Sequence, residues 1–132
     1  MLRSAGLFVP VCVLLLSSAS CEHEPPPRTP ETTWKTVASW SGHGNAQLET
    51  FPVERFTWRV RWETSNESPA GAGVFHLTAN SGDSGRILAD VVDTRGVGKD
   101  VAYITEIPHR YYLVVTSSAL DWSIVVEEPV LR

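Results

Sequence analysis

The chain has 132 residues, which is enough for one domain, and its 42% hydrophobic and 20% charged residues are typical of a folded globular protein. This composition excludes a disordered or multispanning chain. The formal net charge of −4 at pH 7 argues against a nucleic-acid partner, because proteins that bind nucleic acids usually carry a basic excess.

Residues 1–20 have the three parts of a secretory signal peptide. Arg3 supplies a positive charge, residues 5–16 form an almost continuous apolar run, and small residues fill positions 17–20. The apolar run is too short to cross a bilayer comfortably. We therefore predict that residues 1–20 direct the chain out of the cytoplasm.

The cysteine that follows this segment is the next feature. Cys21 comes directly after Ser18-Ala19-Ser20 and resembles the lipobox cysteine of bacterial lipoproteins, where the signal is cut before a cysteine that then carries lipid. The resemblance implies a lipid on Cys21 and a place in the bacterial cell envelope, periplasmic or surface-facing. Two alternatives remain open: ordinary cleavage after Ser20, and an uncleaved anchor.

Residues 21–33 have the composition of a tether. Positions 22–33 contain four of the nine prolines and no aliphatic residue, so they lack the side chains that would pack in a core. In polyproline form the segment would reach about 40 Å, at about 3.1 Å per residue. The chain has no cysteine after Cys21, so we expect a domain without disulfides.

Residues 34–132 are predicted to form one all-β domain, an antiparallel β-sandwich of about eight strands without helices. The strand signals recur at a spacing near ten residues and no segment has a helical period. The predicted strands are 34–40, 46–51, 56–63, 74–79, 87–92, 100–107, 111–115 and 122–126.

Two of these segments decide the expected core. In 56–63 the alternate residues Phe56, Trp58, Val60 and Trp62 are apolar, which predicts a strand with one buried face. Segment 111–128 contains two alternating apolar triplets with a short polar connection, which predicts a β-hairpin. We expect Trp122 of this hairpin to pack across the sandwich against 56–62.

The order of the apolar motifs carries a second resemblance. The motifs are Phe51-x-Val53, Trp58-x-Val60-x-Trp62, Gly73-x-Phe75-x-Leu77, Tyr111-x-Leu113-x-Val115 and Trp122-x-Ile124-x-Val126. Together they resemble the β-sandwich modules of secreted bacterial proteins and lipoproteins, including the pre-peptidase C-terminal-like and CUB-like sandwiches, over residues 34–129. The resemblance implies the fold and brings no catalytic residue with it.

One tetrapeptide suggests an enzyme. Gly82-Asp83-Ser84-Gly85 is the sequence around the nucleophile of trypsin-like proteases, and His43 precedes it as a base would. Asp, Ser and Gly are also the usual residues of turns. We predict that Ser84 lies in a turn and that the protein is not an enzyme; a small hydrolase is the third-ranked alternative.

The remaining candidates concern ligands. The histidines, His23, His43, His76 and His109, have no zinc-ligand spacing, and Asp83, Asp90, Asp93 and Asp100 form no calcium consensus loop, so we predict no metal and no cofactor. Aromatic side chains can stack on sugars. Trp34 and Trp40 share a face of their predicted strand with Thr36 and Ala38, which are not strongly apolar, and are therefore the candidate binding residues.

These observations together predict a membrane-anchored envelope lipoprotein. Its sandwich would be a non-enzymatic binding or structural module, with an envelope protein or a glycan as partner. The alternative is a secreted carbohydrate-binding or inhibitor module.

Overall fold

The computed structural model describes Gly6 and residues 32–130, and these residues form nine strands and no helix. The predicted signal peptide, Cys21 and the tether lie outside the described residues, apart from Gly6 and positions 32–33. The strands are β1 (Trp34–His43), β2 (Ala46–Gln47), β3 (Phe51–Val53), β4 (Thr57–Ser65), β5 (Val74–Ser81), β6 (Ile87–Arg95), β7 (Gly98–Thr105), β8 (His109–Ser118) and β9 (Asp121–Pro129).

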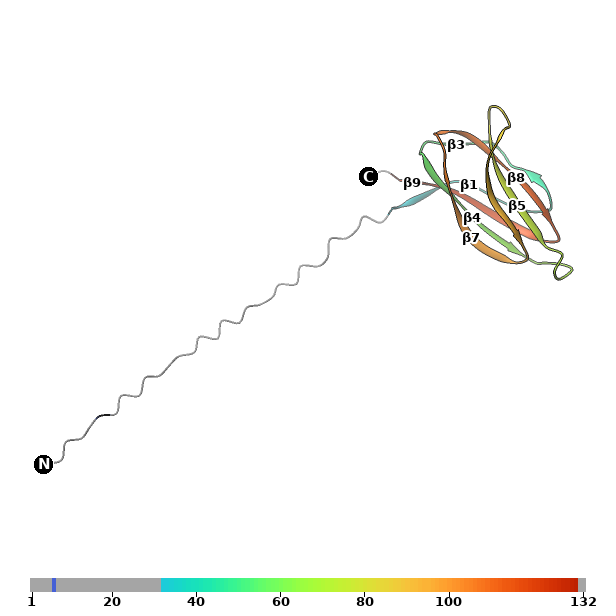
Figure 1. Ribbon diagram of the computed structural model, residues 1–132, viewed down its shortest axis with the longest axis horizontal. Coiled ribbons are helices and arrows are strands. Elements are labelled where there is room, and N and C mark those ends of the chain that lie inside the picture. Colours follow the sequence, from blue (N-terminus) through green and yellow to red (C-terminus); the bar gives the residue numbers. More distant parts are fainter. Residues whose placement is uncertain (1–5, 7–31, 131–132) are drawn as a thin grey trace.

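The strands form two antiparallel sheets that pack face to face (Figure 1). Sheet I has the order β1-β9-β4-β7, and sheet II has the order β2-β8-β5-β6, with β3 also beside β8. Most connections cross from one sheet to the other; β5 and β6 are the neighbours joined directly within a sheet. This two-sheet winding is that of a jelly roll, and it confirms the predicted all-β sandwich.

The predicted hairpin over 111–128 is wrong. β8 pairs with β5 in sheet II, whereas β9 pairs with β1 and β4 in sheet I. The chain crosses between the sheets at Ala119 and Leu120, where Ala119 has a φ of 59° and Leu120 is fully buried. Alternation shows only that a strand has one buried face, and strands of facing sheets satisfy it as well as strands of one hairpin.

The core lies between the two sheets and is built from the predicted apolar motifs. Its largest fully buried side chains include Trp58, Val60, Phe75, Leu77, Tyr111, Leu113, Val115, Leu120, Ile124 and Val126. Trp122 is 4% exposed, but it lies beside Thr64 of β4 in the same sheet, so its expected packing across the sandwich against that strand is wrong.

Phe56 was also misassigned to the core. β4 begins at Thr57, and Phe56 lies in the preceding turn with 64% of its surface exposed. Trp62, at the other end of the same predicted face, is half-buried against Phe75, with ring centroids 5.5 Å apart. The alternation in 56–63 therefore identified the strand and its buried face, but it began that face two residues too early, at Phe56 instead of Trp58.

Several predicted boundaries shift for local reasons. The segment 46–51 divides into β2 and β3. Pro52 lies in β3, which pairs only with β8, so the backbone N–H that proline lacks is not needed for a second neighbouring strand. The predicted loop at 93–99 is mostly strand, because Gly96 makes a tight turn with a φ of 80° between β6 and β7.

A β-bulge in β1 separates the two candidate tryptophans. Thr36 pairs with Glu127 and Ala38 pairs with Val126, so one extra residue interrupts the register between them. Such an insertion reverses which face the even-numbered residues take. Trp40 consequently points toward the core, 5.8 Å from the ring of Phe51, while Trp34 lies over the outer face of sheet I.

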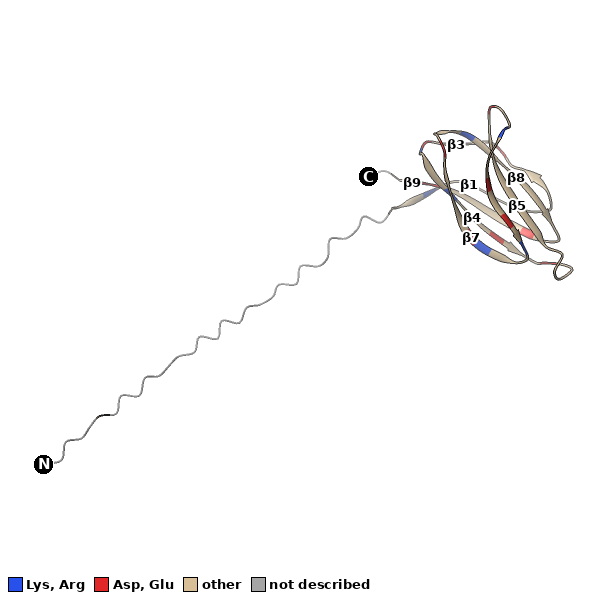
Figure 2. Ribbon diagram, in the orientation of Figure 1, with Lys and Arg blue, Asp and Glu red and all other residues tan. Residues whose placement is uncertain are grey.

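The two ends of the sandwich have different loops. The tether end carries 54–56, 82–86, 106–108 and the start of β1; the far end carries 44–45, 66–73, 96–97 and 119–120. In Figure 1, β1 begins at the tether end, away from the end of β4 that precedes the 66–73 loop. Figure 2 shows Lys, Arg, Asp and Glu dispersed over several strands, with no single charged stripe.

Candidate functional site

The outward side of sheet I carries several candidate binding groups. Its strands pair in register, so their outward side chains form continuous rows across the sheet. We call this surface the outer face; its residues include Ser39, Ser41, Arg59, Arg61, Glu63, Lys99, Val101, Tyr103, Ser123, Val125 and Glu127.

A charged cluster lies on the part of the outer face near the tether end. Arg59 and Arg61 each donate from Nε to the same Oε1 of Glu127, at 2.9 and 2.8 Å. Glu127 is only 7% exposed, and a buried carboxylate is stable only when it is paired in this way. Because two cations face one carboxylate, the cluster keeps a local positive excess.

Trp34 covers this cluster. Its ring lies 4.1 Å from the guanidinium carbon of Arg59, a cation–π contact, and its centroid is 5.9 Å from that of Tyr103 in an edge-on arrangement. Tyr103 is 62% exposed. The sequence interpretation found Trp34 but missed Tyr103; the spacing of Lys99, Val101 and Tyr103 along β7 puts them on one face but does not show that β4 lies beside them.

A hollow of about 330 Å³ also lies on the outer face. Its lining residues come from β4, β7 and β9: Arg61, Trp62, Glu63, Lys99, Asp100, Val101, Ser123 and Val125. The two valines are apolar, and the charged residues around them are of both signs. The hollow therefore suits a ligand with an apolar face and polar edges.

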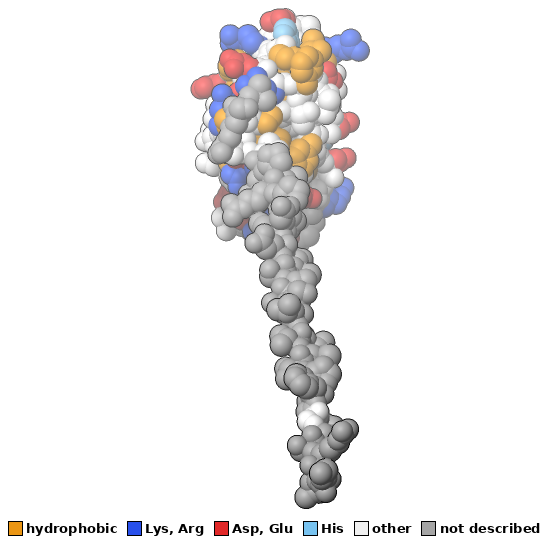
Figure 3. Space-filling model, turned by 90° about the vertical axis from the view of Figure 1, so that its left-hand side faces the viewer, with side chains coloured by type: hydrophobic (Ala, Val, Ile, Leu, Met, Phe, Trp, Pro, Cys, Tyr) orange, Lys and Arg blue, Asp and Glu red, His pale blue; other side chains and the backbone are white. Residues whose placement is uncertain are grey.

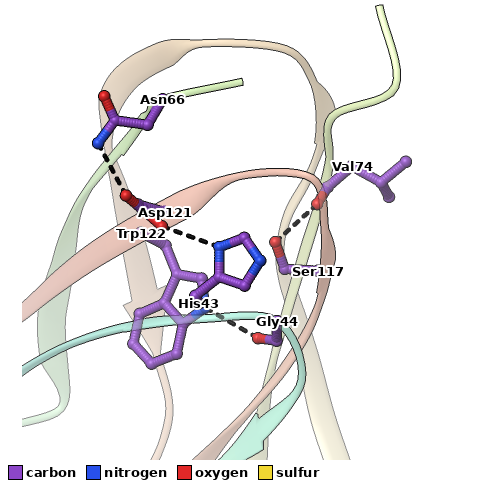
Figure 4. A network of polar contacts seen from close by, with 7 residues as sticks. All are labelled: His43, Gly44, Asn66, Val74, Ser117, Asp121 and Trp122. Carbon is purple, nitrogen blue, oxygen red and sulfur yellow. Dashed lines mark hydrogen bonds and ion pairs between the residues drawn. The ribbon is translucent and has the colours of Figure 1, made fainter. Parts of the chain in front are cut away.

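A second cluster closes the far end (Figure 4). His43 Nδ1 lies 2.8 Å from Asp121 Oδ1, and Asn66 Nδ2 donates to Asp121 Oδ2 at 2.7 Å. The bond from Asn66, followed by the bond from His43, lowers the pKa of Asp121. Trp122 Nε1 donates to the carbonyl of Gly44 at 2.9 Å, so the cluster joins β1 and the 66–73 loop to the start of β9.

The structure does not bring Ser84 to this histidine. Ser84 lies in a turn at the tether end, where its backbone N–H donates to Ser81 Oγ and its own Oγ accepts from the N–H of Arg86. His43 and Asp121 lie at the far end. The turn assignment of Ser84 is confirmed, and the order of His43 and Ser84 along the chain does not correspond to a spatial pair.

The other predicted ligand residues are dispersed. His76 pairs with Asp90 at 3.0 Å, and His109 pairs with Asp83 at 2.9 Å. Within the described part of the chain, no three His, Cys, Asp or Glu side chains lie close enough together to hold a metal ion. Residues 32–130 also contain no helix long and apolar enough to cross a membrane.

Comparison with known proteins assigns no family. No family model, no curated protein and no solved structure matches this chain. The observations common to the sequence and the structure are therefore a β-sandwich of two antiparallel sheets, and a fold of this kind serves many functions.

Proposed function

We propose that this chain is a lipid-anchored protein of the bacterial cell envelope whose sandwich is a non-enzymatic binding module. The signal-peptide pattern of residues 1–20 and the lipobox-like position of Cys21 support the anchor. The likeness of the core motifs to the pre-peptidase C-terminal-like and CUB-like modules is consistent with an extracytoplasmic domain. The observation that carries the binding role is the hollow on the outer face.

The hollow has the properties of a ligand surface. Val101 and Val125 give it apolar contact area, while Arg61, Lys99 and Glu63 supply donors and acceptors around them. Paired strands hold all of these side chains, so the surface is largely formed before a ligand arrives. A polar polymer of the envelope, such as a glycan, fits this combination.

The carbohydrate-binding alternative rests on one further observation. Tyr103 is two residues from Val101 on the same face of β7 and is 62% exposed, with Trp34 beside it. An exposed ring next to charged and hydroxyl side chains is the usual arrangement for stacking on a sugar while its hydroxyls form hydrogen bonds. Trp40 packs toward Phe51, so Trp34 is the candidate retained for this surface.

The anchor is tested by fractionation. In cells that express Cys21→Ser, we expect the protein to leave the membrane fraction, and the parent protein to carry a lipid mass on the peptide that begins at Cys21. Unchanged membrane association of Cys21→Ser with residues 1–20 retained would instead establish an uncleaved anchor.

The binding surface is tested with purified peptidoglycan sacculi as the probe. We expect Tyr103→Ala to weaken co-sedimentation about tenfold, which is about 1.4 kcal/mol and within the range of a lost aromatic contact. Thr105→Ala is the matched control, since Thr105 is exposed on the same face of β7. Equal binding by the two variants would remove Tyr103 from the proposed site.

A further inference from the structure

We infer that the tether end of the sandwich docks on the surface of the membrane that holds the anchor. This inference rests on the proposed anchor at Cys21 and adds a second, protein-borne contact with the lipid. Its loops do not line the proposed ligand hollow, although Tyr103 and Trp34, beside these loops, also belong to the proposed sugar-stacking surface.

The exposed apolar side chains are concentrated at this end. Five large hydrophobic residues among those described are more than 60% exposed: Phe56, Ile87, Val97, Tyr103 and Ile107. Four of them lie in or within three residues of the tether-end loops, and Val97 alone lies at the far end. Exposed apolar groups gathered in one place indicate an interaction surface, whereas single ones are ordinary.

The two leading residues belong to loops that contact one another. The N–H of Glu106 donates to the carbonyl of Phe56 at 2.9 Å, which holds the 54–56 and 106–108 loops together. Phe56 and Ile107 are each 64% exposed, and Pro108 is exposed beside Ile107. Figure 3 looks onto this end and shows hydrophobic side chains at the surface between basic and acidic ones.

The position of the tether favours a membrane as the occupant. Only twelve residues separate Cys21 from Trp34, and Trp34 begins β1 at the tether end. A lipid on Cys21 would therefore keep these loops within about 40 Å of the bilayer. A short tether gives an effective concentration in the millimolar range, so a few apolar side chains are sufficient for docking.

The side chains at the tether end also have the chemistry expected at a membrane–water interface. Tyr103 and Trp34 are amphipathic aromatic residues, which are enriched at the level of lipid headgroups. The charges in and next to the loops balance: Arg55, Arg86 and Arg110 are offset by Glu54, Asp83 and Glu106. Docking should consequently depend on apolar insertion and little on the charge of the lipid.

The test measures vesicle binding without the anchor. Every buried core residue lies between Leu48 and Val126, so a chain that begins at residue 21 and carries Cys21→Ser retains the whole core. We expect this chain to co-sediment with vesicles at roughly millimolar lipid, and equally with phosphatidylcholine and with mixed phosphatidylethanolamine–phosphatidylglycerol vesicles. The double variant Phe56→Ser/Ile107→Ser should bind about tenfold less, as expected for two apolar side chains that partly enter the interface.

The matched control is Val97→Ser, because Val97 is 63% exposed at the far end. We expect its vesicle binding to equal that of the parent. Either of two results would overturn docking, and a protein partner would then be the occupant. The first is that the parent chain does not bind vesicles at a lipid concentration about ten times the effective concentration that the tether provides. The second is that the double variant binds as well as Val97→Ser. Failure of the anchor itself would appear separately, as a parent protein without a lipid mass on the peptide that begins at Cys21.

Discussion

The two ends of the sandwich differ in how their loop side chains are bonded and exposed. At the far end, the β1–β2 turn, the 66–73 loop and the start of β9 are joined by side-chain hydrogen bonds around Asp121 and Trp122. At the tether end, Phe56 and Ile107 stand at the surface with most of their area uncovered. The tether end also contains side-chain hydrogen bonds, such as that from Tyr111 to the carbonyl of Ile107, but it leaves these two apolar side chains exposed.

Side chains of the same chemical type also differ in exposure between the two ends. Trp122 and Phe56 are both aromatic and both lie near a strand end, yet Trp122 is 4% exposed and Phe56 is 64% exposed. Truncation of the buried Trp122 should therefore change stability, and truncation of the exposed Phe56 should change association. The following experiments test this contrast.

The largest loss of stability is expected when Trp122 is truncated. Truncation to Ala should lower the free energy of unfolding by about 3–5 kcal/mol, as for other buried aromatic residues, because the ring is buried and its Nε1 is bonded to the carbonyl of Gly44. Phe56→Ala and Ser123→Ala should each change it by less than about 0.5 kcal/mol. Thermal melts compare the three variants, and a Trp122→Ala melt that matches the parent would contradict the core assignment.

A smaller loss of stability is expected when a methyl group is added at Gly42, next to the ring of Trp122. A β-carbon at Gly42 would lie 2.7 Å from Cζ2 of the Trp122 ring, closer than atoms can approach. Gly42→Ala should therefore cost about 1–3 kcal/mol in denaturant melts, as overpacking usually does. Ser41→Ala, at the neighbouring exposed position, is the control; similar melts for both would mean that the ring moves freely.

At the tether end, Tyr111 is the buried group whose ionisation matters. Its hydroxyl donates to the carbonyl of Ile107, and burial, with a smaller effect of Glu106, raises its pKa above the ordinary value of 10.0. The unfolded chain therefore loses this proton first, so stability is complete below about pH 10 and falls as the pH rises toward the folded pKa.

Tyr111→Phe isolates this effect. The variant should be less stable by about 1 kcal/mol at pH 7, because one hydrogen bond is lost, and its stability should fall less between pH 10 and higher pH. Tyr112→Phe provides the comparison, since Tyr112 is only half-buried. Parallel alkaline denaturation curves for the parent and Tyr111→Phe would contradict the assignment.

The smallest effect is expected on the pKa of Asp121. Asn66→Ala removes the bond that contributes most to the lowered pKa, so the pKa of Asp121 should rise toward 3.8. In the parent, the stabilisation by this carboxylate is present above that value and is lost as the pH falls through the lower folded pKa. NMR titration of the carboxyl carbon measures the change, and an unaltered pKa would show that the bond to Asn66 does not persist in solution.

Much of the fold could be predicted because apolar alternation reports burial directly. The segments around Trp58, Leu77, Leu113 and Ile124 are strands whose predicted residues lie in the core. Pairing was not predictable from the same signal: β8 and β9 have the alternation of a hairpin but belong to different sheets. The bulge after Thr36 was equally invisible, because no residue type marks where an extra residue enters a strand.

The candidate site could be predicted only in part. Trp34 was selected because Thr36 and Ala38, on the same predicted face, are not strongly apolar, although the bulge then removed Trp40 from the same surface. Tyr103 was missed because the sequence does not show that β7 lies beside β4, which places this ring next to Arg59. Long-range strand order creates the hollow, and a single sequence carries no direct record of that order.

The central claim, that the tether end faces the membrane, is tested most directly in the anchored protein. Ile107→Cys and Val97→Cys, each labelled with the same fluorophore, are reconstituted through the lipid on Cys21 into vesicles that contain doxyl-labelled lipid. These two side chains are equally exposed, at 64% and 63%, but lie at opposite ends. We predict strong quenching at position 107 and little at position 97; equal quenching at both positions would contradict the account.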